Sequence, residues 1–160
     1  MGVLRYGTSS WSEKTWVGPF YPPGTVPGDY LGHYATQFST VEADVTYYRI
    51  PDHKLVAGWH LKTPEGFVMA AKFPRSIVHG GADATPNPDT LLQPDRVGGD
   101  TEEFLGAMRG LGDKCGPLVL QLPYFNRSVF PDQRAFLGRL DSEMTADERR
   151  KRRMEAAGDA

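Results

Sequence analysis

Short apolar runs recur along the chain, and each is followed by turn residues and then by a segment whose apolar positions have helical spacing. This alternation is typical of βα units that build a parallel sheet. Four of the runs are short and largely apolar, as expected of strands covered on both faces. They comprise residues 4–8, 40–44, 67–72 and 118–122. The pattern therefore predicts an α/β fold with about four parallel β/α units.

Two helices are predicted in the first half of the chain. Residues 27–37 place their apolar side chains on one stripe, with a proline in the first turn. The second helix begins near Asp52 and ends by Thr63, because Pro64 disfavours α geometry at the residue before it. Both ends of this second helix are therefore marked.

The second half of the chain carries weaker signals. Residues 80–99 contain three prolines and four glycines without clear periodicity, which suits either a functional loop or a variable surface insertion. Asp100 and Glu103 then form a capping-box-like start to a helix that Gly116 and Pro117 end before the fourth strand. Pro131 opens a last helix, and beyond residue 141 the apolar signal fades.

The sequence thus separates into a β/α part, residues 1–142, and a charged tail, residues 143–160. Residues 149–153 are all basic and flanked by acids, so we expect a solvated helix or a frayed end. A sharper interpretation is a nucleic-acid contact, because clustered Lys and Arg neutralise phosphates. No aromatic residue is interleaved with these charges, and we therefore do not favour nucleic acid as a partner.

Composition narrows the class of protein. The 160 residues carry a net charge of -2, which gives no global field to attract polyanions. One cysteine cannot form an internal disulfide, and the sequence does not open with the basic segment and apolar run of a signal peptide. No apolar stretch approaches the roughly 20 residues that a spanning helix requires. We expect a cytoplasmic, single-domain protein that does not enter the membrane.

Polar residues stand at the expected carboxyl end of every predicted strand, where β/α sheets bind their ligands. Thr8 ends the first strand, Glu42 and Asp44 lie in the second, Lys72 ends the third and Gln121 lies in the fourth. Two-residue alternation puts Glu42 and Asp44 on one face. If the site is catalytic, Glu42 would act as general base or metal ligand, and Lys72 would stabilise a developing anion.

Glu42 and Gln121 also have a purely structural interpretation, and the charge state of Lys72 has two possibilities. Glu42 could pair with Arg5, which should face the same interior from the neighbouring strand. Lys72 could have a depressed pKa among small side chains, or could remain charged beside carboxylates. Gln121 could be a buried amide that bonds to the backbone. The sequence leaves these alternatives open.

Histidines and aromatic residues add further candidates. The four histidines show no paired ligand spacing, so no metal site is predicted. His79 is the one placed to reach a strand-end pocket, or else to bond the loop backbone. Trp11 and Tyr48 follow the first two strands and could line a pocket or pack across an open barrel end. No Gly-rich phosphate loop, Ser-His-Asp set or Cys-His pair is present, so the cofactor is unknown.

An ordered set of motifs runs from residue 4 to about residue 140. It comprises Gly7-Thr8-Ser9-Ser10-Trp11, Phe20-Tyr21-Pro22, Thr40-Val41-Glu42, Thr46-Tyr47-Tyr48, Thr63-Pro64 and Leu120-Gln121-Leu122-Pro123. In this order the motifs resemble the opening of the YecE-like family, catalogued as domain of unknown function number 72, with departures at Ser10 and Asp44. The resemblance implies a (β/α)8 TIM-like barrel, of which this chain would be the amino-terminal half, because such barrels take about 250 residues.

The function expected from these features is that of an uncharacterised YecE-like barrel protein, truncated, with a strand-end pocket for a small polar or phosphate-bearing ligand. Glu42 and Lys72 are the catalytic candidates, and the ligand-binding candidates are Thr8, Trp11, Tyr48, His79 and Gln121. A barrel cut after four strands exposes two strand edges, which predicts a homodimer. The alternatives are a nucleic-acid or protein interaction scaffold and an inactive fragment. Whether the protein is an enzyme stays open.

Overall fold

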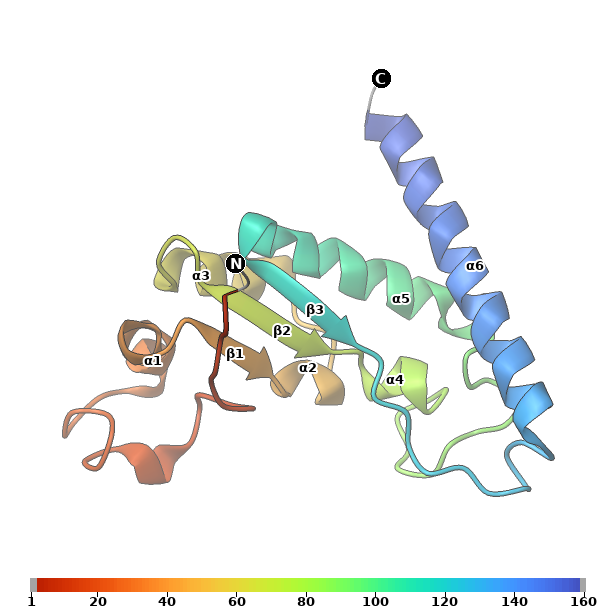
Figure 1. The fold of residues 1–160 in the computed structure, drawn as a ribbon, viewed down its shortest axis with the longest axis horizontal. Coiled ribbons are helices and arrows are strands. Elements are labelled where there is room, and N and C mark those ends of the chain that lie inside the picture. The colour runs from red at the N-terminus through yellow and green to blue at the C-terminus, as the bar shows by residue number, and fades with distance from the viewer. Residues whose placement is uncertain (1–2, 159–160) are drawn as a thin grey trace. The chain divides into compact units, whose positions relative to one another are not determined.

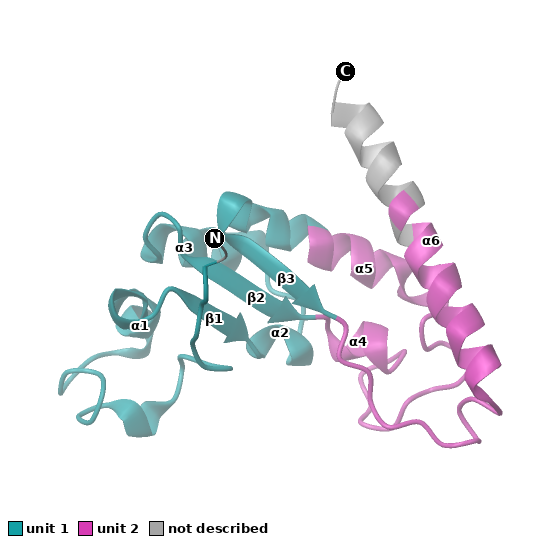
Figure 2. Cartoon of the chain, viewed as in Figure 1, with its two compact units in different colours: residues 1–72, 106–119 teal, residues 73–105, 120–160 magenta. Residues whose placement is uncertain are grey.

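The computed structural model describes residues 3–158, with the side chains of residues 147 and 149–158 outside the description. The chain divides into two compact units, the first formed by residues 1–72 and 106–119 and the second by residues 73–105 and 120–160 (Figure 2). The strands are β1 (Thr40–Ala43), β2 (Val68–Lys72) and β3 (Cys115–Val119). The helices are α1 (Tyr30–Gln37), α2 (Val45–Tyr48), α3 (His53–Lys62), α4 (Arg75–Val78), α5 (Pro94–Met108) and α6 (Gln133–Gly158).

The sheet of the first unit is parallel, in the order β1-β2-β3, with β2 in the middle (Figure 1). Its two faces differ in burial. Val41 and Met69 are among the residues buried on one face, whereas Glu42, Ala70 and Lys72 are only half-buried on the other. Two-residue alternation in the sequence therefore does separate an apolar face from a face that carries charge.

The prediction of a strand at residues 4–8 is wrong, because this segment adopts no strand in the structure. It lies against β1 through the backbone bond from Glu42 N–H to Thr8 O, 3.0 Å. Val3, Leu4 and Tyr6 are 79%, 89% and 73% exposed, so their apolar alternation covers no core. A regular strand would need a surface on which these side chains could pack.

The last strand of the sheet also departs from the prediction, since β3 runs from Cys115 to Val119 rather than over residues 118–122. Gly116 and Pro117, expected to stop a helix, lie inside it. The register with β2 is irregular here, and a Cβ at position 116 would lie 2.6 Å from Val68 Cγ1. Pro117 is exposed and lacks an N–H, which an edge strand tolerates.

Helix α3 begins and ends where the sequence predicts. The Asp52 carboxylate accepts a hydrogen bond from Leu55 N–H at 2.7 Å, and Thr63 is the C-cap before Pro64. Carbonyl groups at the end of α3 also accept hydrogen bonds from a side chain that the sequence pattern does not indicate. Lys114 Nζ donates to His60 O and Thr63 O at 2.6 Å each, and this side chain is 8% exposed. A buried ammonium therefore closes the helix.

The second unit has its own small core, in which Leu91, Leu92 and Phe130 are buried. Its helix α5 begins at Pro94, six residues before the predicted start at Asp100, because proline is pre-organised for a first helical turn. The segment 80–99 is therefore partly helical. Helix α6 continues through the charged tail, and none of the described helices is both long and apolar enough to cross a membrane.

Candidate functional site

An ion-pair cluster lies at the carboxyl ends of β1 and β2. Lys72 Nζ is 3.2 Å from Glu42 Oε1 and 2.6 Å from Asp44 Oδ1. Glu42 and Lys72 share the half-buried face of the sheet, and Asp44 follows β1 directly as the N-cap residue of α2. The three side chains are 31%, 17% and 36% exposed for Glu42, Lys72 and Asp44, so a ligand from solvent can reach them.

The charge state of this cluster follows from its contacts. The hydrogen bond that Lys72 donates to Asp44 is the largest cause that raises the pKa of Lys72. Partial burial opposes this shift, and the hydrogen bond that Lys72 donates to Glu42 adds to it. Of the two states that the sequence leaves open for Lys72, the structure therefore favours the charged ammonium. Two carboxylates and one ammonium give the cluster a formal charge of -1, with oxygens that can accept hydrogen bonds from a ligand.

Thr46 holds the two strand ends in place, and sequence reasoning did not select it as a functional residue. Its hydroxyl is fully buried and lies 2.8 Å from Ala43 O and 2.7 Å from Lys72 O. The local sequence Val45-Thr46-Tyr47-Tyr48 carries no signal for this role. Thr46 thus positions the backbone that carries Lys72.

A hollow of about 270 Å³ adjoins the cluster on the same face of the sheet. It is lined by Gly7, Thr8, Ser9, Thr40, Val41, Glu42 and Ala70. Thr8 is fixed by Tyr34, whose hydroxyl accepts a hydrogen bond from Thr8 N–H at 2.8 Å and donates to Thr40 O at 3.1 Å. The structure therefore brings Thr8 and Glu42 together around one space.

The predicted Arg5–Glu42 ion pair is wrong. Arg5 Nη1 donates to Ser39 O at 3.2 Å and to Gly66 O at 2.8 Å, at the amino ends of β1 and β2. Glu42 lies toward the carboxyl end of β1 and pairs with Lys72 instead. The separation along the strand places the guanidinium and the carboxylate at different ends of the sheet.

Two aromatic candidates lie away from the cluster. Trp11 packs edge-on against Trp59, with ring centroids 5.5 Å apart, and lines a different and larger groove. Tyr48 is 70% exposed and contacts Tyr47 edge-on at 5.4 Å. Neither side chain lines the hollow beside Glu42.

The remaining candidates, His79 and Gln121, belong to the second unit. Burial lowers the pKa of His79, the charge of Arg75 adds to this, and bonds with the backbone of Ala84 and Asp83 oppose it. His79 is buried, which favours a neutral imidazole within the loop. Gln121 lies two residues past the end of β3 and is exposed, so the interpretation as a buried amide is wrong.

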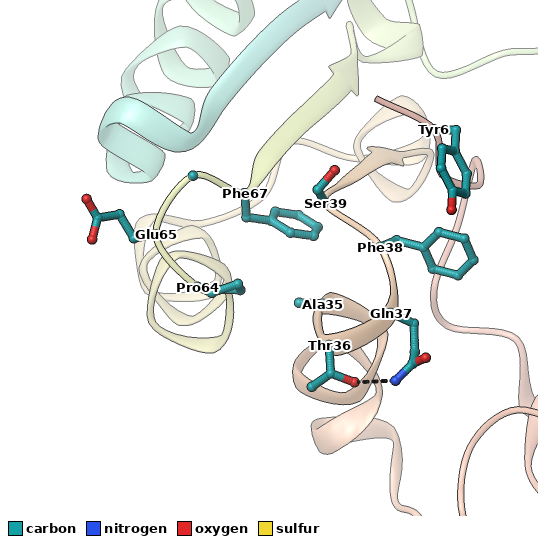
Figure 3. Close-up of a pocket in the computed structure, with 10 residues that line it drawn as sticks. Tyr6, Ala35, Thr36, Gln37, Phe38, Ser39, Pro64, Glu65 and Phe67 are labelled. Carbon is teal, nitrogen blue, oxygen red and sulfur yellow. Dashed lines mark hydrogen bonds between the residues drawn. The ribbon is translucent and has the colours of Figure 1, made fainter. Parts of the chain in front are cut away.

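A hollow of about 310 Å³ lies at the opposite end of the strands, where β1 and β2 begin (Figure 3). Phe67 forms part of its wall, and Tyr6 meets Phe38 edge-on at 5.9 Å. Ligands of β/α sheets bind at the carboxyl ends of strands rather than at this end. We therefore take the Glu42–Asp44–Lys72 cluster as the candidate site.

Among the residues that the structure describes, no three His, Cys, Asp or Glu side chains gather into a metal-binding group. Glu42 and Asp44 are two carboxylates that could ligate a metal ion, but both of them contact the Lys72 ammonium. The alternative of a nucleic-acid contact, which the sequence does not favour, concerns side chains 149–153, which lie outside the described residues.

A family model and two solved structures point to the same protein family. The family model described as "Protein of unknown function DUF72" matches residues 5–153. A DUF72 family protein from Thermotoga maritima MSB8 has a similar solved structure, with 23% identity and a TM-score of 0.59 over 87% of this chain and 51% of that one. The solved structure of another DUF72 family protein, from Enterococcus faecalis V583, is similar with 24% identity and a TM-score of 0.54. The match covers 74% of this chain and 39% of that one.

These structures share the fold with this chain at identities too low to transfer a function. The chain spans between 39% and 51% of the length of the two solved relatives. No curated protein matches the sequence.

Proposed function

The chain belongs to the DUF72 family of proteins of unknown function, and on that premise we propose that it is a cytoplasmic protein whose residues 1–142 form part of a (β/α)8 barrel with a strand-end site for a small polar ligand. The contact of Lys72 Nζ with Glu42 Oε1 and Asp44 Oδ1 is the observation that carries this proposal. It joins one donor and two acceptors at the end of a parallel sheet that ligands commonly occupy, and Glu42 of this cluster lines an open hollow.

The charges of the cluster favour a small polar ligand over a phosphate-bearing one. A phosphate would have to approach two carboxylates that already neutralise Lys72, and like charges at short range repel. Ligand hydroxyl groups instead donate to Glu42 and Asp44 and accept from Lys72. We therefore propose a neutral polyhydroxy compound rather than a phosphate-bearing one.

The same geometry limits the chemistry that could follow binding. A protonated Lys72 cannot attack a carbonyl carbon as a free amine, but it can stabilise negative charge on an oxygen. Glu42 is the general-base candidate, because its second oxygen can face a ligand while Oε1 contacts Lys72.

Ligand-detected NMR with ribose and with inorganic phosphate as probes tests this site. The unaltered chain is expected to bind ribose with higher affinity than phosphate. Both Glu42→Gln and Lys72→Met are expected to lower the affinity for ribose about fivefold or more, since each removes a charge-assisted hydrogen bond. Glu13→Gln is the matched control, because that carboxylate caps an exposed turn through Thr15 N–H. Equal binding by all three variants would contradict the proposal, and tighter binding of phosphate would overturn the choice of ligand.

We also propose that the partial barrel forms a homodimer. Within the described residues β3 is an edge strand of the sheet, and an unpaired edge offers backbone donors and acceptors to a second chain. Light scattering coupled to size-exclusion chromatography is expected to give twice the chain mass of 17.7 kDa. A monomer that stays monomeric at about 0.1 mM would contradict this expectation.

A further inference from the structure

A groove of about 650 Å³ on the first unit takes no part in the strand-end cluster. Its walls come from the loop at Trp11, the start of α1, helix α2 and the whole length of α3. This volume lies within the range of roughly 300 to 1,000 Å³ that is typical of small-molecule sites. The groove is therefore large enough to hold a ring system.

The floor of the groove is apolar and aromatic. Leu31 and Trp59 are buried at 2% and 5% exposure. Trp11 is half-buried and meets Trp59 edge-on at 5.5 Å, and Leu55 of α3 also lines the space. A planar apolar body would cover the surface of Trp11 and Leu55 that is still exposed and exclude water from it.

The rim of the groove is positively charged. Asp52 uses a carboxylate oxygen to cap α3, and Lys62 Nζ donates to Gly28 O at 2.7 Å. Arg49 and Lys54 are exposed, and neither of them forms an ion pair with a described carboxylate. Two cations beside the aromatic floor thus carry charge that no described carboxylate neutralises.

We propose that this groove binds a small aromatic anion, with its ring on the Trp11 and Leu55 surface and its acidic group held by Arg49 and Lys54. The apolar floor supplies binding to the ring, and the rim selects for negative charge. A neutral compound of the same shape would bind through the apolar floor alone, without the attraction of the charged rim. The proposal is independent of the strand-end site, because the two sets of lining residues have no member in common.

Tryptophan indole N–H signals in a two-dimensional NMR titration test the proposal with 2-naphthoate as the probe. The chain has three tryptophans, and Trp16 packs against Phe20 and Tyr21 outside the groove. We expect saturable shifts of the Trp11 and Trp59 signals and a stationary Trp16 signal. No shift at about 1 mM probe, or a shift confined to Trp16, would overturn the proposal.

The charge requirement is tested by variants and by a neutral probe. The double variant Arg49→Gln with Lys54→Gln is expected to bind 2-naphthoate about tenfold more weakly and to bind 2-naphthalenemethanol unchanged. Lys14→Gln is the matched control, because it removes an exposed positive charge outside the groove. Equal affinity of the two probes for the unaltered chain would sink the proposal, whatever the outcome for the strand-end site.

Discussion

Replacing Lys114 by methionine is expected to lower the free energy of unfolding by about 3 kcal/mol, measured by urea denaturation. The ammonium donates to His60 O and Thr63 O at 2.6 Å each, and the side chain is 8% exposed. Methionine keeps most of the side-chain length but offers no donor. Two carbonyl oxygens at the end of α3 would then be left without this partner in a place where water enters poorly.

Lys62→Met provides the comparison for this effect. Lys62 also donates to a backbone carbonyl, Gly28 O at 2.7 Å, but it is exposed, so water can replace the lost donor. We expect a loss below about 1 kcal/mol in this variant. Equal losses in the two variants would show that the burial of Lys114 does not govern its contribution.

Local signals were sufficient for the parts of the fold that neighbouring residues determine. Asp52 and Pro64 bracket α3 in the sequence, and the helix occupies the space between them in the structure. The parallel sheet was likewise predictable, because short apolar runs alternate with helical segments. Their positions at strand ends also predicted that Glu42 and Lys72 lie at one edge of the sheet, where they form an ion pair.

The errors arose where distant contacts decide the conformation. Residues 4–8 have the composition of a strand, but Arg5 bonds to Ser39 O and Gly66 O and the apolar side chains stay exposed. At β3, the turn residues Gly116 and Pro117 predict the end of a helix, but both lie inside the strand. The space beside Val68 requires a glycine at 116, and that requirement appears only when the two strands are side by side.

The candidate site was predictable in part for the same reason. Lys72 and the two carboxylates could be placed at strand ends from their positions along the chain. The role of Thr46 could not, because it depends on the hydroxyl lying beside the carbonyl groups of both Ala43 and Lys72. Such a contact joins residues that are 26 positions apart in the sequence.

Gly7→Ala is expected to lower the free energy of unfolding by about 2 kcal/mol and to abolish ribose binding at the strand-end hollow. A Cβ at this position would lie 2.1 Å from Thr40 O and 2.8 Å from Tyr34 Oη, so the segment must move away from β1. That movement breaks the hydrogen bonds that Thr8 makes with Glu42 N–H and Tyr34 Oη. The hollow then loses the wall that Gly7, Thr8 and Ser9 provide.

Gly28→Ala is the matched control, since a Cβ there would meet nothing within 4 Å. We expect its stability to stay within about 0.5 kcal/mol of the unaltered chain and its ribose binding to be unchanged. The readouts are urea denaturation and ligand-detected NMR on the same preparations. A Gly7→Ala chain that keeps both its stability and its ribose binding would mean that residues 3–8 do not pack on β1, and that the hollow owes nothing to Thr8.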